Sequence, residues 1–469
     1  MLDPPAGNLA ALPERLLQRM DVPGPRYTSY PTADRFVEAF GPQEYMRALR
    51  ERRRGMRVGG AVPMSVYVHI PFCESVCYYC ACNKIVTRQH GRAQEYLEDL
   101  ETEIRLHAQE LGEGEALSQL HLGGGTPTFL RDDEIARLLS TLRAAFRFTP
   151  GAEQSIEVDP RTADAARLER LASLGFNRIS FGVQDVDPQV QAAIHRVQPV
   201  EMVRELMQAA RRSGFGSINV DLIYGLPRQT PQSFASTIAQ VAALRPDRIA
   251  LFAYAHLPER FKPQRRIAPE ELPSSHARLE MLAGAIAGFL SHGYVYIGMD
   301  HFALPGDPLA VAKRQGRLHR NFQGYSTQPD CDLVALGVSA IGRMGATYSQ
   351  NAKTLPEYHD AMRHGRFATV RGVELGRDDV LRRAVIMALM CQGQLDLQAL
   401  GMAHMIDPHA YFAAELERLK PFQAEGLVEV DDEAIRVTAN GWFFVRGIAM
   451  VFDRYLQSQE LRARFSRII

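Results

Sequence analysis

The sequence has no excess of charge of either sign: its 469 residues contain 54 Lys plus Arg and 54 Asp plus Glu. We therefore expect no nucleic-acid or membrane partner, although this balance does not exclude a local basic pocket. A long apolar run is also absent. The longest uncharged stretch, residues 282–299, is interrupted by Ser291-His292-Gly293 and predicts a helix, a turn and a strand rather than a membrane span. The N-terminus lacks the basic and apolar regions of a secretory signal, which predicts a cytoplasmic protein.

Cysteine is scarce, and its distribution is uneven. Of six cysteines, two stand alone, and the other four crowd into residues 73–82 as Cys73, Cys77, Cys80 and Cys82. A secreted disulfide framework would spread its cysteines along a short chain. Crowding of this kind in an intracellular chain indicates metal or redox chemistry.

The remaining composition is that of an ordinary globular protein, with 46% apolar and 23% charged residues. This excludes a wholly disordered chain, a collagen and a coiled-coil rod. We expect an N-terminal arm (1–60), a partial barrel (61–290), an α/β extension of the barrel (291–365) and a mainly helical C-terminal domain with a small wing (366–469).

Six strand candidates alternate with helical patterns in the region of the predicted barrel. They are Ser65–Ile70, Gln119–Gly123, Ser155–Asp159, Arg178–Gln184, Ile218–Tyr224 and Arg248–Tyr254. This alternation predicts βαβ units and a parallel sheet, and hence an α/β fold. Beyond residue 290, two further strands are predicted over residues 294–297 and 333–338.

Most of these strands have one apolar and one largely polar face. In the first strand, Val66, Val68 and Ile70 share one face, whereas Tyr67 and His69 share the other. A flat parallel sheet covered on both sides would be apolar on both faces. The pattern therefore favours a partial (β/α)6 barrel with extra strands and a polar lumen that binds ligands, over a sheet with one solvated face.

A short two-strand signal near the C-terminus covers residues 427–430 and 435–437. It resembles the wing of a DNA-binding module. However, its turn contains Asp431, Asp432 and Glu433, which would repel phosphate, so we favour a structural cap.

The cysteine cluster follows the first predicted strand directly. Spacings of four and three residues place Cys73, Cys77 and Cys80 on one short loop. Thiolates bind iron–sulfur clusters and zinc, but a closed zinc site usually joins two separated pairs of ligands, and no second pair exists here. Three close ligands fit a four-iron cluster with one iron left open, and the spacing does not decide whether Cys82 is a fourth ligand.

This C-x₃-C-x₂-C motif after the first strand of a partial barrel resembles the radical S-adenosylmethionine (SAM) superfamily. The resemblance implies one [4Fe–4S] cluster whose open iron binds SAM and whose electron releases a 5′-deoxyadenosyl radical. The glycine run Gly123–Gly125 resembles the segment that meets the SAM amino group. Glu157, on a polar strand face, could accept hydrogen bonds from a ribose.

Longer stretches of the sequence narrow the resemblance from a superfamily to one family. They are PGPRYTSYPTA (23–33), VYVHIPFC (66–73), LHLGGGTPT (120–128), IEVDPR (156–161), DLIYGLPRQT (221–230), GMDHFA (298–303) and HRNFQGYST (319–327). Together they resemble the oxygen-independent coproporphyrinogen III oxidase family. That resemblance implies the conversion of two propionates of coproporphyrinogen III to vinyl groups in haem biosynthesis, with two SAM consumed per product. It also implies an unidentified one-electron donor, and we expect a monomer.

The resemblance also assigns residues. The cluster ligands would be Cys73, Cys77 and Cys80. A first SAM would be contacted by Tyr67, Tyr79, Gly124, Glu157 and Ile341. A second SAM would be contacted by Gly125, Thr126, Gln184, Arg196, Asp221 and Ala255.

The substrate of such an enzyme carries four propionates, which require cations. Candidates among the basic residues, any of which could instead be a solvated surface charge, are Arg26, Lys84, Arg88, Arg260, Arg265 and Arg266.

Two related functions remain alternatives, a haem chaperone and a radical SAM methyltransferase. The chaperone branch lacks C-x-C-N-K after the cluster motif and carries an H-N-x₂-Y-W signature. This chain has Cys80-Ala81-Cys82-Asn83-Lys84 and reads His319-Arg320-Asn321-Phe322 instead, which favours the oxidase.

Overall fold

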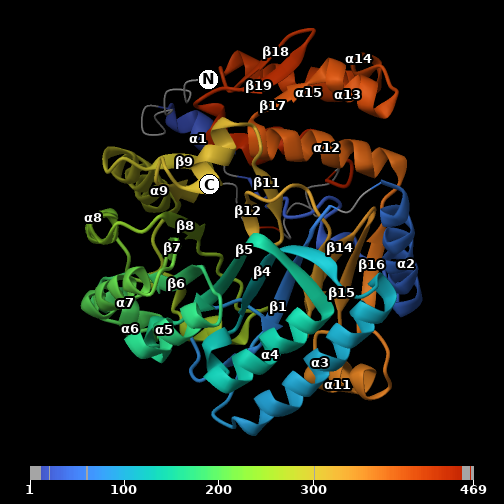
Figure 1. Cartoon of the computed structure of the whole chain (residues 1–469). Helices are drawn as coiled ribbons and strands as arrows, with labels where there is room; N and C mark the ends of the chain where they lie inside the picture. The colour runs from blue at the N-terminus through green and yellow to red at the C-terminus, as the bar shows by residue number, and fades with distance from the viewer. Residues whose placement is uncertain (1–11, 21, 60–61, 300, 457–464, 466–469) are drawn as a thin grey trace.

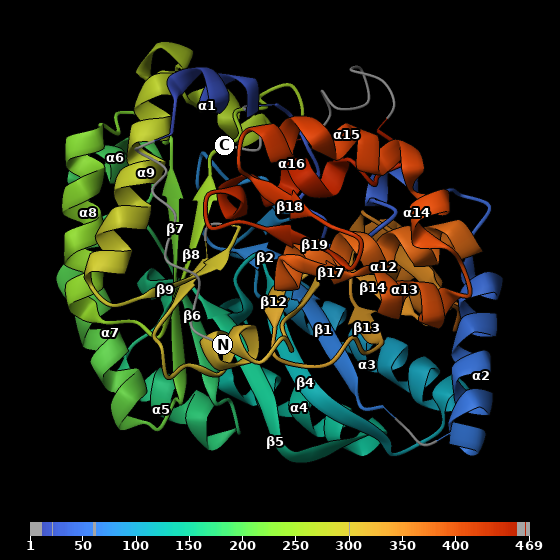
Figure 2. The same cartoon turned by 90° about the horizontal axis from the view of Figure 1, so that it is seen from above.

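The structure, a computed structural model, describes residues 12–20, 22–59, 62–299, 301–456 and 465. Its main feature is a sheet of 12 strands with helices around its outer side (Figures 1 and 2). This mixed α/β architecture, with a parallel centre and a mainly helical C-terminal region, confirms the predicted fold class.

The centre of the sheet consists of six parallel strands, each paired with the next. They are β1 (Met64–Ile70), β4 (Glu115–Gly124), β5 (Phe146–Val158), β6 (Arg178–Gln184), β7 (Ser217–Tyr224) and β8 (Arg248–Ala253). All six predicted strands are confirmed. Strand β5 begins nine residues earlier than predicted, because a segment containing Thr149-Pro150-Gly151, which is typical of a turn, nevertheless continues the strand beside the start of β4.

Helices cover the outward face of these strands (Figure 2). They are α3 (Gly91–Leu111), α4 (Asp132–Ala145), α5 (Ala165–Ser173), α6 (Pro188–Ala193), α7 (Val200–Arg212), α8 (Pro231–Leu244) and α9 (Ser275–Ser291). The outward side chains Val66, Val68, Ile156 and Ile218 are fully buried, so the apolar strand faces form the core. Helix α9 ends at Ser291, and His292 and Gly293 separate it from the next strand. This confirms the helix, turn and strand predicted over residues 282–299.

Further strands extend the sheet on both sides. Beside β1 lie, in order, β13 (Leu333–Leu336), β14 (Ile341–Met344), β15 (Thr347–Asn351) and β16 (Thr369–Glu374). Strand β13 pairs with β1 in parallel, and each of the other three pairs with the strand before it in antiparallel orientation. Beside β8 lie β10 (His301–Ala303) and β9 (Val295–Gly298), both antiparallel. Strands predicted over 294–297 and 333–338 are thus present. The domain boundaries remain predictions, and β16 joins the sheet although it lies beyond residue 365.

Short elements complete the region around the open ends of the barrel strands. These are β2 (Phe72–Cys73), β3 (Ile85–Val86), and the hairpin β11 (His319–Asn321) and β12 (Gly324–Ser326). Two further short helices lie elsewhere: α10 (Pro308–Arg314) packs against β9, and α11 (Leu355–Arg363) packs against α3.

The N-terminal arm packs onto the molecule. It contains α1 (Glu14–Met20) and α2 (Pro42–Gly59). Between them, the Tyr27 and Tyr30 side chains are buried, and the Tyr27 hydroxyl donates a hydrogen bond to Asp453 (3.0 Å). The arm is therefore anchored to the C-terminal part of the chain.

The C-terminal region is mainly helical, with a small sheet. Its elements are α12 (Arg377–Gln392), β17 (Gln394–Asp396), α13 (Leu397–His404), α14 (Pro408–Tyr411), α15 (Ala413–Ala424), β18 (Val428–Val430), β19 (Ala434–Val437) and α16 (Val445–Met450). The predicted wing corresponds to β18 and β19; β17, which pairs with β19, was not predicted. Asp431 accepts hydrogen bonds from the amides of Glu433 and Ala434, which agrees with a structural cap. No helix in the described ranges has the length and apolar character of a membrane span.

Candidate active site

The lumen of the barrel contains two adjoining cavities that share lining residues. The cysteine-loop cavity, about 440 Å³, lies at the carboxyl ends of the parallel strands, and the barrel cavity, about 550 Å³, lies deeper between them. Their common wall is formed by Cys82, Gly124, Glu157, Ser180, Asp221 and Phe252. Both volumes lie in the range of small-molecule sites. The structure thus supports a ligand-binding lumen rather than a solvated sheet face.

The three cysteines of the motif line the cysteine-loop cavity, and all are free. The hydroxyl of Thr126 lies 3.5 Å from Cys73 Sγ. Arg161 Nη2 and Arg196 Nη1 lie 3.5 Å and 3.4 Å from Cys77 Sγ. Hydrogen-bond donors thus lie beside two of the three sulfurs, although burial raises the pKa of the Cys73 thiol to about 11.

The donor geometry discriminates between a single ion and a cluster. In the described part of the chain, no three His, Cys, Asp or Glu side chains converge tightly enough to hold one metal ion. Zinc requires its sulfur ligands at about 2.3 Å from one centre. Three thiols that instead surround a cavity beside two arginines fit a larger, anionic iron–sulfur cluster.

The glycine run fixes the cysteine loop against β4. Gly125 donates its amide hydrogen to the Ile70 carbonyl (2.8 Å), and a Cβ at Gly125 would lie 2.8 Å from the backbone of Pro71 and Phe72. Gly124 has φ +117°, a conformation that favours glycine. Close approach at Gly125 is thus explained by packing on the chain itself, and the predicted contact of these glycines with SAM remains a prediction.

Glu157 lies in the common wall of the two cavities and is held from two sides. Its carboxylate accepts a hydrogen bond from the Gly124 amide (3.1 Å), and its Oε1 lies 3.1 Å from His121 Nε2. Burial acts to raise the pKa of Glu157, but His121 and the Gly124 amide outweigh it and lower the pKa below its ordinary value. Glu157 is therefore a fixed carboxylate that faces the lumen.

Asp221 has the opposite electrostatic character. Burial and the nearby charge of Glu157 raise the pKa of Asp221 to about 6, although Asn219 and Ser180 donate hydrogen bonds to its carboxylate (2.7 and 3.1 Å). One lumen therefore holds two carboxylates that titrate in different pH ranges.

The structure brings most of the predicted SAM contacts to this space. Those in the cysteine-loop cavity are Tyr79, Gly124, Gly125, Thr126, Glu157, Gln184, Arg196 and Asp221. Tyr67 and Ile341 line the barrel cavity. Ala255 lines neither cavity; its carbonyl accepts a hydrogen bond from Gln264 Nε2 (3.2 Å). Gln184 ends β6 with φ +68°, a strained conformation that often marks functional sites.

Several lining residues were not predicted as site residues. They include His69, His121, Arg178, Asn219, Arg248 and Phe252. The signal was present, because His69, Arg178 and Asn219 share the polar strand faces of Tyr67, Gln184 and Asp221. His69 holds the Tyr67 hydroxyl at 3.0 Å from its Nδ1, and the Tyr67 ring stacks on His121.

The cations proposed for the substrate divide into three groups. Lys84 and Arg88 line the cysteine-loop cavity, and Arg26 lines the barrel cavity, where its guanidinium lies 5.7 Å from the centre of the Phe252 ring. Arg260 lines an outer cavity of about 650 Å³ formed largely by the N-terminal arm. Arg265 and Arg266 line none of these three cavities.

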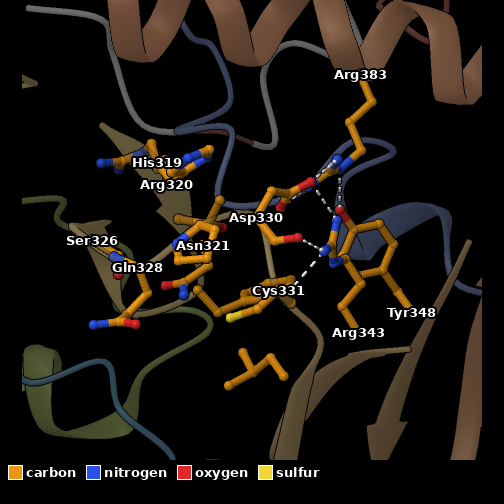
Figure 3. Close-up of a pocket in the computed structure, with 14 residues that line it drawn as sticks. His319, Arg320, Asn321, Ser326, Gln328, Asp330, Cys331, Arg343, Tyr348 and Arg383 are labelled. Atoms are coloured by element: carbon orange, nitrogen blue, oxygen red, sulfur yellow. Dashed lines mark hydrogen bonds and ion pairs between the residues drawn. The ribbon is translucent and has the colours of Figure 1, made fainter. Parts of the chain in front are cut away.

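An ion-pair cluster joins the C-terminal region to the barrel next to the β11–β12 hairpin (Figure 3). Asp330 binds Arg383 of α12 through both oxygens (2.8 Å each) and Arg343 of β14 (2.9 Å). Burial opposes the charge of Asp330, but Arg383 and Arg343 hold its pKa well below the usual range. The space here is about 20 Å³, too small for an organic ligand, so the cluster is a structural joint.

Comparisons with known proteins show which class of enzyme has this fold and site. The Radical SAM superfamily matches residues 67–241, which contain the cysteine loop and most of the parallel strands, and the HemN C-terminal domain matches residues 375–444. The barrel, the cysteine loop and the glycine run therefore belong to a radical SAM enzyme, an oxidoreductase that uses a [4Fe–4S] cluster and SAM.

Full-length relatives narrow the class to a family. The chain is 48% identical over 456 residues to oxygen-independent coproporphyrinogen III oxidase of Pseudomonas aeruginosa (97% of this chain, 98% of the relative). It is 48% identical over 454 residues to the Escherichia coli enzyme of the same name (97% and 98%). The solved structure of coproporphyrinogen III oxidase (HemN) from Escherichia coli superposes with a TM-score of 0.89 at 47% identity, covering 95% of this chain and 99% of that one. The chain belongs to the oxygen-independent coproporphyrinogen III oxidase family.

Proposed function

We propose that this chain converts coproporphyrinogen III to protoporphyrinogen IX without O₂, as a step of haem biosynthesis. Each of two propionate side chains gives one hydrogen atom to the 5′-deoxyadenosyl radical and one electron to a one-electron acceptor, releases CO₂, and thereby becomes a vinyl group. The observation that carries the proposal is the cysteine-loop cavity, which is lined by three free thiols, two arginines and a fixed carboxylate. Family membership favours this activity over the haem-chaperone and methyltransferase alternatives.

The chain's own residues would hold the cofactors. Cys73, Cys77 and Cys80 would bind the cluster, and Arg161 and Arg196 would offset its negative charge. When bound, the reduced cluster supplies the electron that cleaves SAM, and the 5′-deoxyadenosyl radical formed takes a hydrogen atom from the propionate β-carbon. Most residues predicted to contact the two SAM molecules line the cysteine-loop cavity, so both molecules would lie toward that end of the lumen, with the oxygens of Glu157 in the wall common to both cavities.

The deeper cavity would receive the tetrapyrrole. Arg26 and Thr28 of the arm and Phe322 of the β11–β12 turn line both the barrel cavity and the outer cavity. A substrate entering there would be enclosed by the N-terminal arm and the β11–β12 turn, which limits the access of water to a radical reaction.

Three finer features belong to the same proposal. We expect a monomer, because the described residues of one chain form the whole site. We expect a one-electron donor protein, and a cytoplasmic location, which the six free cysteines favour. Analytical ultracentrifugation of the reconstituted protein tests the first of these.

The activity is tested anaerobically with coproporphyrinogen III, SAM and dithionite. We expect two 5′-deoxyadenosine molecules for each protoporphyrin detected after oxidation. Formation of 5′-deoxyadenosine with no vinyl product, or a methylated porphyrin, would contradict the proposal.

A further inference from the structure

A strongly basic surface segment follows the last parallel strand. Residues 259–267 contain four cations, Arg260, Lys262, Arg265 and Arg266, and a single acidic residue, Glu259. All four cations are exposed, and none forms an ion pair with a side chain in the described part of the structure. On a chain with no net charge, such a local excess is an electrostatic signal for an anionic partner.

The segment is fixed to the cysteine loop. Gln264, which is fully buried between the cations, donates from Nε2 to the Tyr79 carbonyl (2.9 Å) and accepts at Oε1 from the Leu257 amide (2.6 Å). Buried Ile267 belongs to the apolar cluster that also includes Tyr78 and Tyr79. The four charges therefore have a defined position relative to Cys77 and Cys80, the cysteines that flank these tyrosines.

Aromatic rings line the same surface. The Arg266 guanidinium lies 5.1 Å from the centre of the Tyr78 ring, which stacks on the His195 ring at 5.0 Å with an interplanar angle of 8°. His195 Nδ1 lies 2.8 Å from the Val76 carbonyl, so both rings are tied to the cysteine loop. Val197 beside them is 65% exposed. Charge and apolar surface thus meet directly outside the loop that carries Cys77.

The substrate is not the expected occupant of this surface. Lys262, Arg265 and Arg266 line none of the three cavities that open along the lumen. A cluster held behind the cysteine loop, however, must receive one electron from outside for every SAM cleaved. A basic patch that contacts this loop would steer an acidic protein toward that position.

We propose that Lys262, Arg265 and Arg266, together with the Tyr78–His195 ring pair, form the docking surface for a small acidic electron-carrier protein. The reduced carrier loses one electron, and the cluster behind Cys77 and Cys80 gains it. This inference rests on the proposed function, because only a protein with a reducible cluster needs such a partner.

The test uses reconstituted holoenzyme and reduced plant-type [2Fe–2S] ferredoxin as the acidic probe. The patch variant is Lys262→Glu/Arg265→Glu/Arg266→Glu. The control, Arg54→Glu/Arg204→Glu/Arg212→Glu, makes the same change of charge at exposed positions of α2 and α7. Calorimetry at low salt measures ferredoxin affinity, and stopped-flow absorbance measures the rate of cluster reduction.

We expect the patch variant to bind ferredoxin about tenfold more weakly and to be reduced correspondingly more slowly, because three attractive contacts become repulsive. The control should stay within about twofold of wild type, and the difference should shrink in about 1 M salt, where the Debye length is only 3 Å. Turnover driven by dithionite should be the same in all three proteins.

Three results would overturn the proposal. The first is a patch variant that binds ferredoxin like the wild type. The second is a raised KM for coproporphyrinogen III in the dithionite assay, which would assign the patch to the substrate. The third is duplex DNA that binds as tightly as ferredoxin with the same sensitivity to the variant. Absence of vinyl product from wild type with dithionite would instead reject the proposed function and leave the binding result standing.

Discussion

The two ends of the lumen differ in how their arginines are paired with carboxylates. At the cysteine-loop end, Arg161 and Arg196 share one carboxylate, Asp159, at 2.6 Å and 3.0 Å, and both also contact the Cys77 thiol. Two cations there face one carboxylate and one ionisable thiol. The protein thus leaves positive charge directed at the place where an anionic cluster would bind.

In the barrel cavity, by contrast, the chain matches its own charges. Arg178 pairs with Glu153 (2.8 Å) and Arg248 with Asp307 (2.8 Å), one carboxylate for each guanidinium. Arg248 and Asp307 are almost completely buried. One end is therefore completed by a cofactor and the other by the protein, so changes at the first should cost function and changes at the second should cost stability.

Removal of one thiol should give the largest loss of function at the cysteine-loop end. Cys77→Ser should abolish turnover and lower the iron content from about four atoms per chain, because the cluster loses a ligand. The free energy of unfolding of the metal-free protein should hardly change. Iron analysis, the anaerobic assay and urea unfolding measure these effects, with Cys391→Ala in α12 as the control that should retain iron.

Cys82→Ser extends this test to the residue whose role the spacing leaves open. Cys82 lies in the common wall of the two cavities. We expect this variant to keep its iron, and a loss of iron would make Cys82 a ligand.

Asp307→Asn is the counterpart in the barrel cavity. It leaves the Arg248 guanidinium buried without its carboxylate, which should cost about 3–5 kcal/mol in the free energy of unfolding. Arg137→Ala is the control, because it removes an exposed pair with Glu101 and should cost less than about 1 kcal/mol. Urea unfolding of the metal-free proteins measures both; equal costs would remove the distinction between the two ends.

The same two ends explain what the sequence could and could not predict. Alternation within the strands predicted the six central strands and the polar lumen, because the side-chain period of a strand is fixed by its geometry. The cysteine spacing predicted a single loop, since ligands close in sequence need no tertiary information. Even the missed lining residues His69, Arg178 and Asn219 lay on faces already identified as polar.

Long-range partners could not be predicted in this way. Asp307 caps α10 and pairs with Arg248 59 residues away, and Asp330 joins Arg343 to Arg383. Such pairs depend on how the barrel closes rather than on local periodicity. Strands β14, β15, β16 and β10 were not predicted for the same reason, because their pairing is decided by neighbours distant in sequence.

Asp221, in the wall common to both cavities, should make the stability of the protein depend on pH. Its pKa in the folded protein is raised to about 6, so between about 4 and 6 the folded state binds more protons than the unfolded state. The stability of the metal-free protein should therefore fall as pH rises through this window, by roughly 3 kcal/mol from this group. Urea unfolding at a series of pH values, with Asp221→Asn as the reference that lacks this dependence, measures the effect as a difference between the two curves.

His121 acts at the common wall by holding Glu157. His121→Ala removes one of the two groups that fix this carboxylate, and loss of a hydrogen bond to a charged group should weaken SAM binding by about tenfold or more. The effect should appear in the KM for SAM, with iron content unchanged. His121→Gln, which can still donate toward Glu157, should recover part of the affinity. An unchanged KM in the Ala variant would separate Glu157 from SAM binding.

The smallest expected effect is at Arg26, which belongs to the arm and faces the barrel cavity without a carboxylate partner among the described residues. It thus differs from Arg178 and Arg248 of the same cavity, as a group reserved for a substrate propionate would. Arg26→Ala should raise the KM for coproporphyrinogen III about fivefold, in line with roughly 1 kcal/mol for one partly exposed ion pair. Arg26→Lys should recover part of it, and SAM binding and unfolding should not change. If the KM for the substrate stayed at the wild-type value, Arg26 would be a surface charge that packs on Phe252, and the barrel cavity would hold its substrate by other groups.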